Sequence, residues 1–388
     1  MNFEYPAEAE AFRAELRAWL EEHYTDEYRR AKPLFACTLD DPDLATHREW
    51  NALLADAGYA AISWPAEYGG RRAGVMEQVV FAEEMHRARA PHTVNLIGLS
   101  NIAPSIMTFG TDEQKARFLP AMRRGDDIWC QGFSEPDAGS DLAGLKATAV
   151  RDGDHYVVNG QKTWNTLGNL ANWCELLVRT DPDAPKHKGI SCLLVDMTLP
   201  GIEVRPLTTI ANEREFNEIF LTDVRVPVSA LLGAENEGWR VAMTTLTHER
   251  GGVAQLHLGL RSRIGDLLDL AKRTPLGDGR MAADDPALRE RLARLYLEGE
   301  LLKMLADRAI SGALHGRELG PEASIAKLVW SEVLQHVGEV AGLVLGPDAN
   351  QGTWGRDRVA MRSYTIAGGT TQVNKNIIAQ RILGLPRR

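Results

Sequence analysis

The spacing of apolar residues changes twice along this chain, and that change limits the folds it can adopt. Two sets of apolar residues near the start recur at helical spacing: Phe12, Leu16, Trp19 and Leu20, and then Trp50, Leu53, Leu54 and Ala57. From about Trp129 short β-rich segments alternate with Pro, Gly and Asp, and after Gly233 the helical spacing returns. We therefore predict three domains: a helical domain over residues 1–126, a β-domain over 127–233 and a helical bundle over 234–388.

Local signals place several elements inside the first two regions. Thr111 followed by Gln114 predicts a capping box that starts a helix. The dipeptides Asp152-Gly153 and Asn159-Gly160 predict turns on either side of a short strand over residues 155–158. Further strand candidates follow, which together predict a β-domain of six to eight strands: CELLVRT, GISCLLVDM, IEVRPL and EIFLTDVRVP.

The last third of the chain contains signals for several helices. Residues 239–271 contain no proline and predict one long helix. Asp285 followed by Pro286 predicts the start of a second helix, and Pro321 predicts the start of a third. We expect the final helix to begin near Thr371.

Charge and cysteine content exclude several kinds of partner. The formal net charge of −9 argues against nucleic acid or an anionic membrane surface as the main partner. The N-terminus carries charges throughout, and no run of about 18 apolar residues occurs, so we expect neither a secretory signal nor a membrane span. The four cysteines lie far apart and predict reduced, mostly buried thiols in a cytoplasmic protein.

Several common catalytic motifs are missing from the sequence. No G-x-G-x-x-G lies between a strand and a helix, which argues against the usual nicotinamide-binding fold. There is no H-E-x-x-H, no G-x-S-x-G and no paired aspartate cluster. We therefore expect neither a metal site nor a common hydrolase.

Four separate motifs stand out instead. Residues 130–141 read CQGFSEPDAGSD and residues 159–166 read NGQKTWNT, while WPAEYGG lies at 64–70 and IAGGTTQVNKNIIAQRILGLPR at 366–387. Taken alone, SEPDAGSD is typical of a polar turn whose acidic side chains face solvent. Together, and in this order, the four motifs resemble those of the acyl-CoA dehydrogenase family over essentially the whole chain. The resemblance implies an α+β fold with N-terminal helices, a central β-barrel-like domain and a C-terminal four-helix bundle.

The resemblance also implies that the chain binds FAD. Matched by motif, Gln131, Phe133 and Ser134 line the flavin, Trp164 lies against it and Thr166 bonds its N5 edge. Hydrogen bonds of this kind tune the flavin as an electron acceptor. The alternative for Trp164 is a core tryptophan that closes the β-domain.

Two residues near the C-terminus match those that reach the FAD ribose and pyrophosphate. They are Thr370 and Gln372. The alternative is that Thr370 or Thr371 is simply the N-cap of the last helix. Both interpretations can hold together, because the N-terminus of a helix favours phosphate groups.

The proton-abstracting base departs from the usual family pattern. Most members carry a glutamate directly before the Gly-Thr of the C-terminal motif, where this chain has Gly368. Some relatives supply the base from the long helix after the β-domain, and this chain has His248-Glu249-Arg250 at the matching position. We therefore predict Glu249 as the base, with the alternative that it is an ordinary solvated carboxylate. The N–H of Gly368 is predicted to bind the thioester carbonyl.

The remaining contacts predicted from the resemblance concern CoA. Ser140 matches the serine that meets the pantetheine arm, and Arg250 matches the arginine beside the opening through which CoA enters. The alternative for Arg250 is a solvated charge on a helix.

The predicted reaction is α,β-dehydrogenation of an acyl-CoA to the trans-2-enoyl-CoA, with electrons passed to an electron-transfer flavoprotein. The resemblance implies a homodimer or homotetramer. Two alternatives stay open. One is an acyl-CoA oxidase that uses dioxygen, and the other is a subunit without a base that completes the FAD site of a partner in a heteromeric dehydrogenase.

Overall fold

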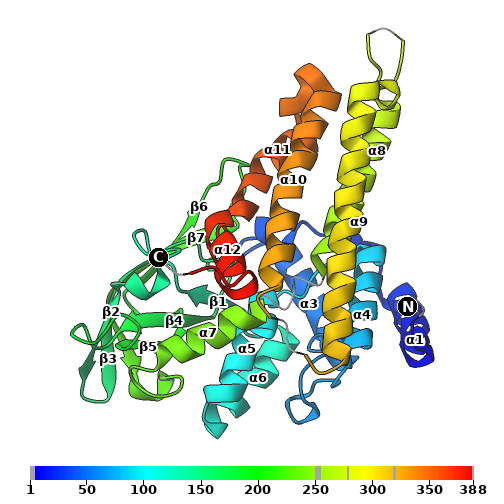
Figure 1. Cartoon of the computed structure of the whole chain (residues 1–388). Helices are drawn as coiled ribbons and strands as arrows, with labels where there is room; N and C mark the ends of the chain where they lie inside the picture. Colours follow the sequence, from blue (N-terminus) through cyan, green and yellow to red (C-terminus); the bar gives the residue numbers. More distant parts are fainter. Residues whose placement is uncertain (1–4, 250–254, 278, 318–319, 387–388) are drawn as a thin grey trace. The chain divides into compact units, whose positions relative to one another are not determined.

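The computed structural model describes residues 5–249, 255–277, 279–317 and 320–386, with the side chain of Glu249 outside the description. The chain forms two compact units, whose elements are drawn in Figure 1. The sheet unit comprises residues 1–78, 87–209 and 213–249, and the helical unit comprises residues 79–86, 210–212 and 250–388. The predicted three-domain boundaries stay a prediction.

Helices form throughout the N-terminal region, and the two predicted from apolar spacing are the first and the third of them. The helices are α1 (Ala7–His23), α2 (Asp26–Arg30), α3 (Pro42–Asp56), α4 (Val75–Ala88), α5 (Ala103–Phe109) and α6 (Asp112–Arg124). Helix α1 buries Phe12, Leu16 and Leu20 on one face. At the start of α6, the N–H of Gln114 donates to Thr111 Oγ1 and the N–H of Thr111 donates to Gln114 Oε1, so the predicted capping box is confirmed.

Seven strands make one sheet in the sheet unit (Figure 1). They are β1 (Trp129–Gly132), β2 (Thr148–Asp152), β3 (His155–Lys162), β4 (Trp173–Arg179), β5 (Ile190–Asp196), β6 (Ile202–Leu207) and β7 (Phe216–Pro227). The order is β1-β4-β2-β3-β7-β6, with β5 paired to β4. Strand β1 stands at one end of this order and runs parallel to β4, so residues 129–132 lie beside Trp173–Leu176 of β4.

One predicted turn is wrong. Asp152-Gly153 does join the antiparallel strands β2 and β3, but Asn159-Gly160 lies within β3, which continues to Lys162. The pairing of β3 with β7 shifts register between Val158 and Gly160. A Cβ on Gly160 would lie 2.7 Å from the Ala147 Cα, so this glycine permits a close approach of two backbones inside the sheet.

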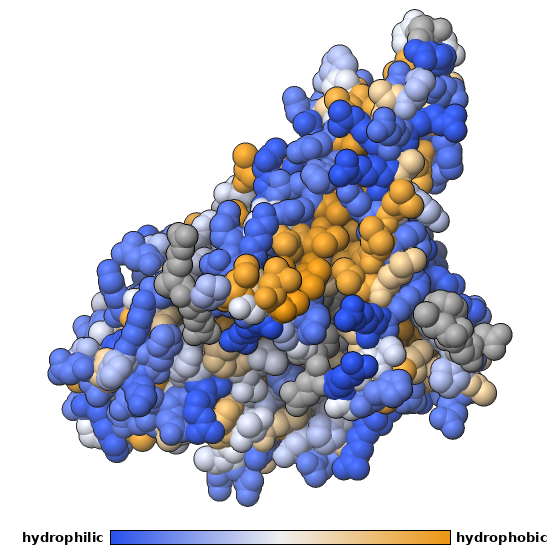
Figure 2. Space-filling view, viewed as in Figure 1, coloured by the Kyte–Doolittle hydropathy of each residue, from blue (hydrophilic) through white to orange (hydrophobic). Residues whose placement is uncertain are grey.

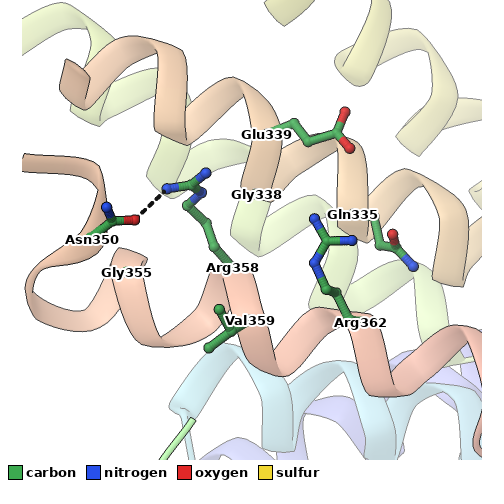
Figure 3. Close-up of a pocket in the computed structure, with 8 residues that line it drawn as sticks. All are labelled: Gln335, Gly338, Glu339, Asn350, Gly355, Arg358, Val359 and Arg362. Carbon is green, nitrogen blue, oxygen red and sulfur yellow. Dashed lines mark hydrogen bonds between the residues drawn. The ribbon is translucent and has the colours of Figure 1, made fainter. Parts of the chain in front are cut away.

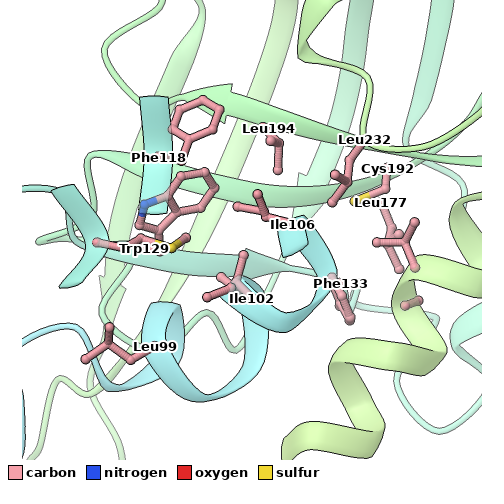
Figure 4. Packing of buried hydrophobic residues seen from close by; sticks show 14 of the residues in the cluster. Leu99, Ile102, Ile106, Phe118, Trp129, Phe133, Leu177, Cys192, Leu194 and Leu232 are labelled. Atoms are coloured by element: carbon pink, nitrogen blue, oxygen red, sulfur yellow. The ribbon is translucent and has the colours of Figure 1, made fainter. Parts of the chain in front are cut away.

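The two faces of the sheet are covered by different apolar clusters. Successive side chains of a strand point to opposite faces of the sheet, so neighbouring residues of β1 belong to different clusters. Trp129 packs with Ile106 of α5 and Phe118 of α6 (Figure 4), and Val241 and Ala242 of α7 (Gly238–Glu249) join the same cluster. Cys130 belongs to the cluster on the other face. Helices α5, α6 and α7 therefore share one apolar core with the face of the sheet that carries Trp129.

The helical unit is built from long helices around its own apolar core. They are α8 (Leu256–Arg273), α9 (Pro286–Leu314), α10 (Ala323–Leu345), α11 (Gly352–Ala360) and α12 (Thr371–Ile377). Asp285 caps α9 and α12 begins at Thr371, as predicted. The single helix predicted over residues 239–271 is described as two, α7 and α8, and residues 250–254 lie outside the described residues.

Helix α10 is rich in apolar residues. Within the described residues, the segment Ala323–Asn350 is the one helix long and apolar enough to cross a membrane. Its apolar residues Val333, Val337 and Val344 are buried in the core of the helical unit. The composition of α10 is therefore that of a core helix.

The four cysteines are buried and free, as predicted. The neighbouring Cys130 thiol and burial raise the pKa of Cys174, and burial raises the pKa of Cys192. Burial also raises the pKa of Cys37, to about 11. The thiols of Cys37, Cys174 and Cys192 therefore stay protonated at neutral pH.

Candidate functional site

The first two motifs lie side by side in the sheet unit. Motif residues Gln131 and Ser134 are half-buried at and just beyond the end of β1, and Phe133 between them is buried in the core. The N–H of Thr163 donates to the carbonyl of Ser134 over 2.9 Å. The fold therefore joins the end of β1 to the segment that follows β3, as expected for two motifs that serve one site.

A buried ion pair holds the loop after β1 in place. Lys162 has no exposed surface, and its Nζ lies 2.8 Å from Oε1 of Glu135, whose side chain is 7% exposed. The same Nζ donates to the carbonyl of Phe133, while the Glu135 carboxylate accepts the N–H groups of Lys146 and Ala147. Burial lowers the pKa of Lys162, and the nearby Glu135 carboxylate opposes that shift. The interpretation of SEPDAGSD as a turn with solvated acids is thus wrong for Glu135.

Trp164 has an unusual backbone and an exposed ring. Its φ is +62°, in the left-handed region that bulky residues seldom adopt. The side chain is 60% exposed, and its edge contacts Phe216 at a centroid distance of 5.8 Å. The alternative of a core tryptophan is therefore wrong, and a flat aromatic face is available for a planar ligand.

Two asparagines that sequence reasoning missed fix the backbone beside Trp164. The N–H of Asn165 donates to the carbonyl of Asn217, and the N–H of Asn217 donates back to the carbonyl of Asn165. Asn165 Nδ2 also donates to the carbonyl of Gln131 over 2.5 Å. Because Thr163 is held by Ser134 and Asn165 by Asn217, both neighbours of Trp164 are fixed, which stabilises its left-handed conformation. Thr166 lies next along the chain and is half-buried.

The C-terminal motif forms a rigid loop in the helical unit. Thr370 is the N-cap of α12, because its hydroxyl accepts the N–H of Val373 over 3.1 Å. Lys327 of α10, which is buried, donates to the carbonyls of Tyr364 and Gly369. Gly368 is exposed with a φ of +63°, a conformation that favours glycine. The predicted helix cap is confirmed, and Lys327 is a supporting residue that no motif indicated.

An open hollow of about 450 Å³ lies beside this loop. Its lining is mostly polar and includes hydroxyl and amide groups together with two carboxylates and an imidazole: Thr365, Thr370, Thr371, Gln335, Gln372, Glu332, Glu339 and His336. The Gln372 side chain is exposed. Hydroxyl and amide groups of this kind suit a ribose better than an acyl chain.

A smaller cavity of about 90 Å³ lies between α10 and α11 (Figure 3). Arg358 and Arg362 reach it from α11 and the residues after it, and Gln335 and Glu339 face it from α10. Arg358 donates to Oδ1 of Asn350 over 3.2 Å. Because Gln335 and Glu339 line both hollows, the two are neighbours on one face of α10. Sequence reasoning missed this arginine-bearing region because it contains no recognised motif.

The predicted base and CoA contacts are described only in part. Glu249 is the last residue of α7, and its side chain and all of Arg250 lie outside the described residues. Ser140 is exposed in the loop after β1. Their roles stay predictions, as do those of the flavin-lining residues, which the structure places in the two separate units.

Three family models match the chain along nearly its whole length. They are described as the acyl-CoA dehydrogenase N-terminal domain over residues 6–126, the middle domain over 130–224 and the C-terminal domain over 236–383. Acyl-CoA dehydrogenase IpdE1 of Mycobacterium tuberculosis is 40% identical over 388 aligned residues, which cover 98% of each chain. The similarity therefore extends over all the motifs discussed above.

Solved structures agree with the sequence comparisons. One, described as the Tcur3481-Tcur3483 steroid ACAD, has a TM-score of 0.85 and 30% identity with coverage of 100% of both chains. Another, the ChsE4-ChsE5 complex from Mycobacterium tuberculosis, has a TM-score of 0.83 and 34% identity, again over 100% of both chains. The helical, sheet and helical regions of this chain thus follow one another as in those proteins.

Proposed function

Because this chain belongs to the acyl-CoA dehydrogenase family of FAD-dependent oxidoreductases, we propose that it converts an acyl-CoA thioester to the trans-2-enoyl-CoA. The observation that carries the proposal is the exposed ring of Trp164 on a left-handed backbone, held by hydrogen bonds on both sides beside the end of β1. A bulky residue held in a left-handed conformation costs free energy, and such strain is concentrated at ligand sites, so a planar ligand that covers the ring is the explanation we propose.

The residues present fit FAD. In the sheet unit, Gln131, Ser134 and Thr166 are half-buried near Trp164 and would offer polar groups to the flavin, while Phe133 anchors the same segment in the core. In the helical unit, Thr370 and Gln372 line the polar hollow and would hold the ribose and pyrophosphate. When bound, FAD supplies the acceptor for the hydride that leaves the substrate β-carbon.

Replacing Trp164 with alanine is expected to raise the dissociation constant for FAD by about two- to tenfold, since aromatic stacking is worth about 0.5 to 1.5 kcal/mol. The unfolding temperature of the FAD-free protein should change little, because the ring is largely exposed. Fluorescence titration of the FAD-free protein measures the binding. Trp164→Phe, which keeps a flat ring, is the control and should bind nearly normally. Normal FAD affinity in Trp164→Ala would contradict the proposed contact.

The proposed chemistry divides between a base and an oxyanion donor. Glu249 takes the α-proton, and the N–H of Gly368 binds the thioester carbonyl, where negative charge develops. A donor of this kind is worth about 3 kcal/mol in comparable sites. Arg250 and Ser140 would bind the CoA moiety through their charge and hydroxyl group.

We propose an acyl group that is branched or cyclic near the reacting bond. Where most relatives place a glutamate side chain, this chain has the single hydrogen of Gly368, which leaves room beside the α- and β-carbons. The similarity to a structure described as a steroid ACAD supports a bulky, ring-containing acyl group. The preference should be graded, because an extra buried methylene is worth only about 1 to 3 kcal/mol.

Replacing Gly368 with glutamate is expected to lower kcat/KM for branched or cyclic thioesters by about tenfold more than for straight ones. The new side chain would fill the space that the bulky acyl group needs. Gly368→Ala is the matched control, because it carries the same strain at a φ of +63° without the long side chain. The measurement is kcat/KM on both substrate classes. Equal losses for all substrates would mean that Gly368 serves backbone geometry alone.

The overall proposal is tested with purified protein. We expect a yellow protein with about one non-covalent FAD per active site, and turnover of acyl-CoA thioesters with an artificial electron acceptor. A colourless protein that gains no flavin spectrum on addition of FAD would refute it. We propose an electron-transfer flavoprotein as the natural acceptor. Peroxide release with the substrate alone would instead identify an acyl-CoA oxidase.

Two similar structures, the Tcur3481-Tcur3483 steroid ACAD and the ChsE4-ChsE5 complex, are each described by two components, so a subunit role is a second candidate. Helix α9 carries an outward apolar row that would suit such an assembly: Leu297, Leu301 and Met304 are each more than half exposed at i, i+4 and i+7. Figure 2 shows apolar side chains gathered over this part of the helical unit.

We propose a homodimer or homotetramer that covers this face. The mass of the pure protein in light scattering tests this, and a monomer active only with a second chain would favour the heteromeric alternative.

A further inference from the structure

One buried acid in the sheet unit is not explained by the proposed reaction. Glu175 of β4 has no exposed surface, and its side chain points toward α7. Its Oε1 accepts the hydroxyl of Thr245 over 2.8 Å, and Oε2 has no partner among the described residues. A leucine would fill such a position in an apolar core at lower cost, since a poorly paired buried carboxyl is destabilising.

The contact belongs to a short polar chain that crosses the core. Ser105 of α5 lies with its Oγ 2.7 Å from Thr245 Oγ1, so three elements meet at this threonine: α5, α7 and β4. All three side chains are fully buried. The surroundings are apolar, and they include Val241 and Ala242 one turn earlier on α7. The hydroxyl of Thr245 is therefore the polar junction between α7 and the sheet.

Thr245 lies close to the C-terminal end of α7, near the proposed base. It is the last buried residue of the helix among those whose side chains are described, since the three residues that follow are half-buried or exposed. Glu249 ends the helix four residues later, which is about one helical turn. Whatever fixes Thr245 therefore fixes the turn from which the proposed base extends.

We infer that Glu175 and Thr245 together form a positioning clamp, in which a buried acid holds the last turn of α7 and thereby orients the turn that carries Glu249, the proposed base. The inference rests on the proposed function, because it assigns the clamp to the base of that reaction. Neither residue contacts the reacting atoms, so both act through Glu249.

The charge state of Glu175 follows from its surroundings. Burial raises the pKa of Glu175 to about 8, and the hydrogen bond from Thr245 opposes that shift. The facing groups are Ser105 from α5, Thr245 from α7 and the Cys192 thiol from β5, whose own pKa burial raises. Among the described residues, no cation pairs with Glu175, so it is protonated at neutral pH.

Kinetics test the clamp. Thr245→Val, which keeps the shape and removes the hydroxyl, is expected to lower kcat by roughly tenfold, because small misplacements of reacting groups are costly. KM and bound FAD should stay nearly unchanged, and the apparent pKa of the base in the pH profile of kcat should move. Thr245→Ser, which keeps the hydroxyl, should restore kcat. Thr244→Val is the control, since among the described residues the Thr244 hydroxyl donates to the Arg240 carbonyl of its own helix and to no other element.

Equal kcat values in Thr245→Val and Thr244→Val, or failure of Thr245→Ser to restore kcat, would overturn the inference. Inactivity of the unmodified protein with every thioester would instead refute the proposed function.

A second measurement needs no turnover: the difference in unfolding temperature between Glu175→Gln and the unmodified protein. From about pH 4.5 to about 8 the folded protein keeps a proton that the unfolded chain releases, so the unmodified protein should lose stability relative to Glu175→Gln as pH rises. A difference independent of pH would show that Glu175 is charged and would contradict a neutral clamp.

Discussion

Replacing Glu249 with glutamine is expected to lower turnover by at least about a hundredfold, the usual effect of losing a general base. Glutamine keeps the size and hydrogen-bonding capacity of the side chain but does not accept the α-proton. FAD binding and the unfolding temperature should stay close to normal. The measurement is kcat with a saturating thioester and an artificial acceptor.

The control for this variant is Glu237→Gln, just before α7, where the exposed carboxylate pairs with Arg240. Loss of a surface pair of this kind is worth less than about 1 kcal/mol, so turnover should be unaffected. Near-normal turnover in Glu249→Gln would mean that the base lies elsewhere. That result would also remove the reason for the clamp formed by Glu175 and Thr245.

Replacing Lys162 with methionine is expected to destabilise the protein by about 3 to 5 kcal/mol, because it leaves the Glu135 carboxylate buried without its partner. Glu135 is 7% exposed and also holds the N–H groups of Lys146 and Ala147, so the loop after β1 should loosen. FAD affinity should fall with it, since Phe133 and Ser134 lie in that segment. Urea unfolding of the FAD-free protein measures the loss.

The matched control is the double variant Lys162→Met with Glu135→Gln. It removes both charges and keeps an acceptor oxygen for a backbone N–H, so it should recover part of the lost stability. If the double variant is less stable than Lys162→Met alone, the ion pair is not the source of the effect. The loop would then depend on the hydrogen bonds that Glu135 accepts.

Much of the fold is predictable from the sequence because the relevant signals are local. The capping box at Thr111, the cap at Asp285 and the apolar face of α1 each depend on residues within a few positions of one another. The prediction of a turn at Asn159-Gly160 is wrong because distant contacts decide the conformation there. Those residues are paired with β7 and pass close to Ala147, so tertiary contacts override the local preference of the dipeptide.

The candidate site is predictable only where a motif marks it. Trp164 and Thr370 were identified from the family resemblance, and local rules alone would have made Trp164 a core residue. Asn217 lies 52 positions from the Asn165 carbonyl that it binds, and Lys327 lies 42 positions from Gly369, so no local pattern indicates either contact. The burial of Glu135 likewise depends on its ion pair with Lys162, which is the last residue of β3.

The central claim is that this chain oxidises an acyl-CoA with Glu249 as the base. The most direct measurement is the visible absorbance of the bound flavin after anaerobic mixing with acyl-CoA thioesters. The account predicts rapid bleaching with a branched or cyclic thioester in the unmodified protein, and bleaching slowed at least about a hundredfold in Glu249→Gln. Unchanged absorbance with every thioester in a protein that holds FAD would contradict the claim.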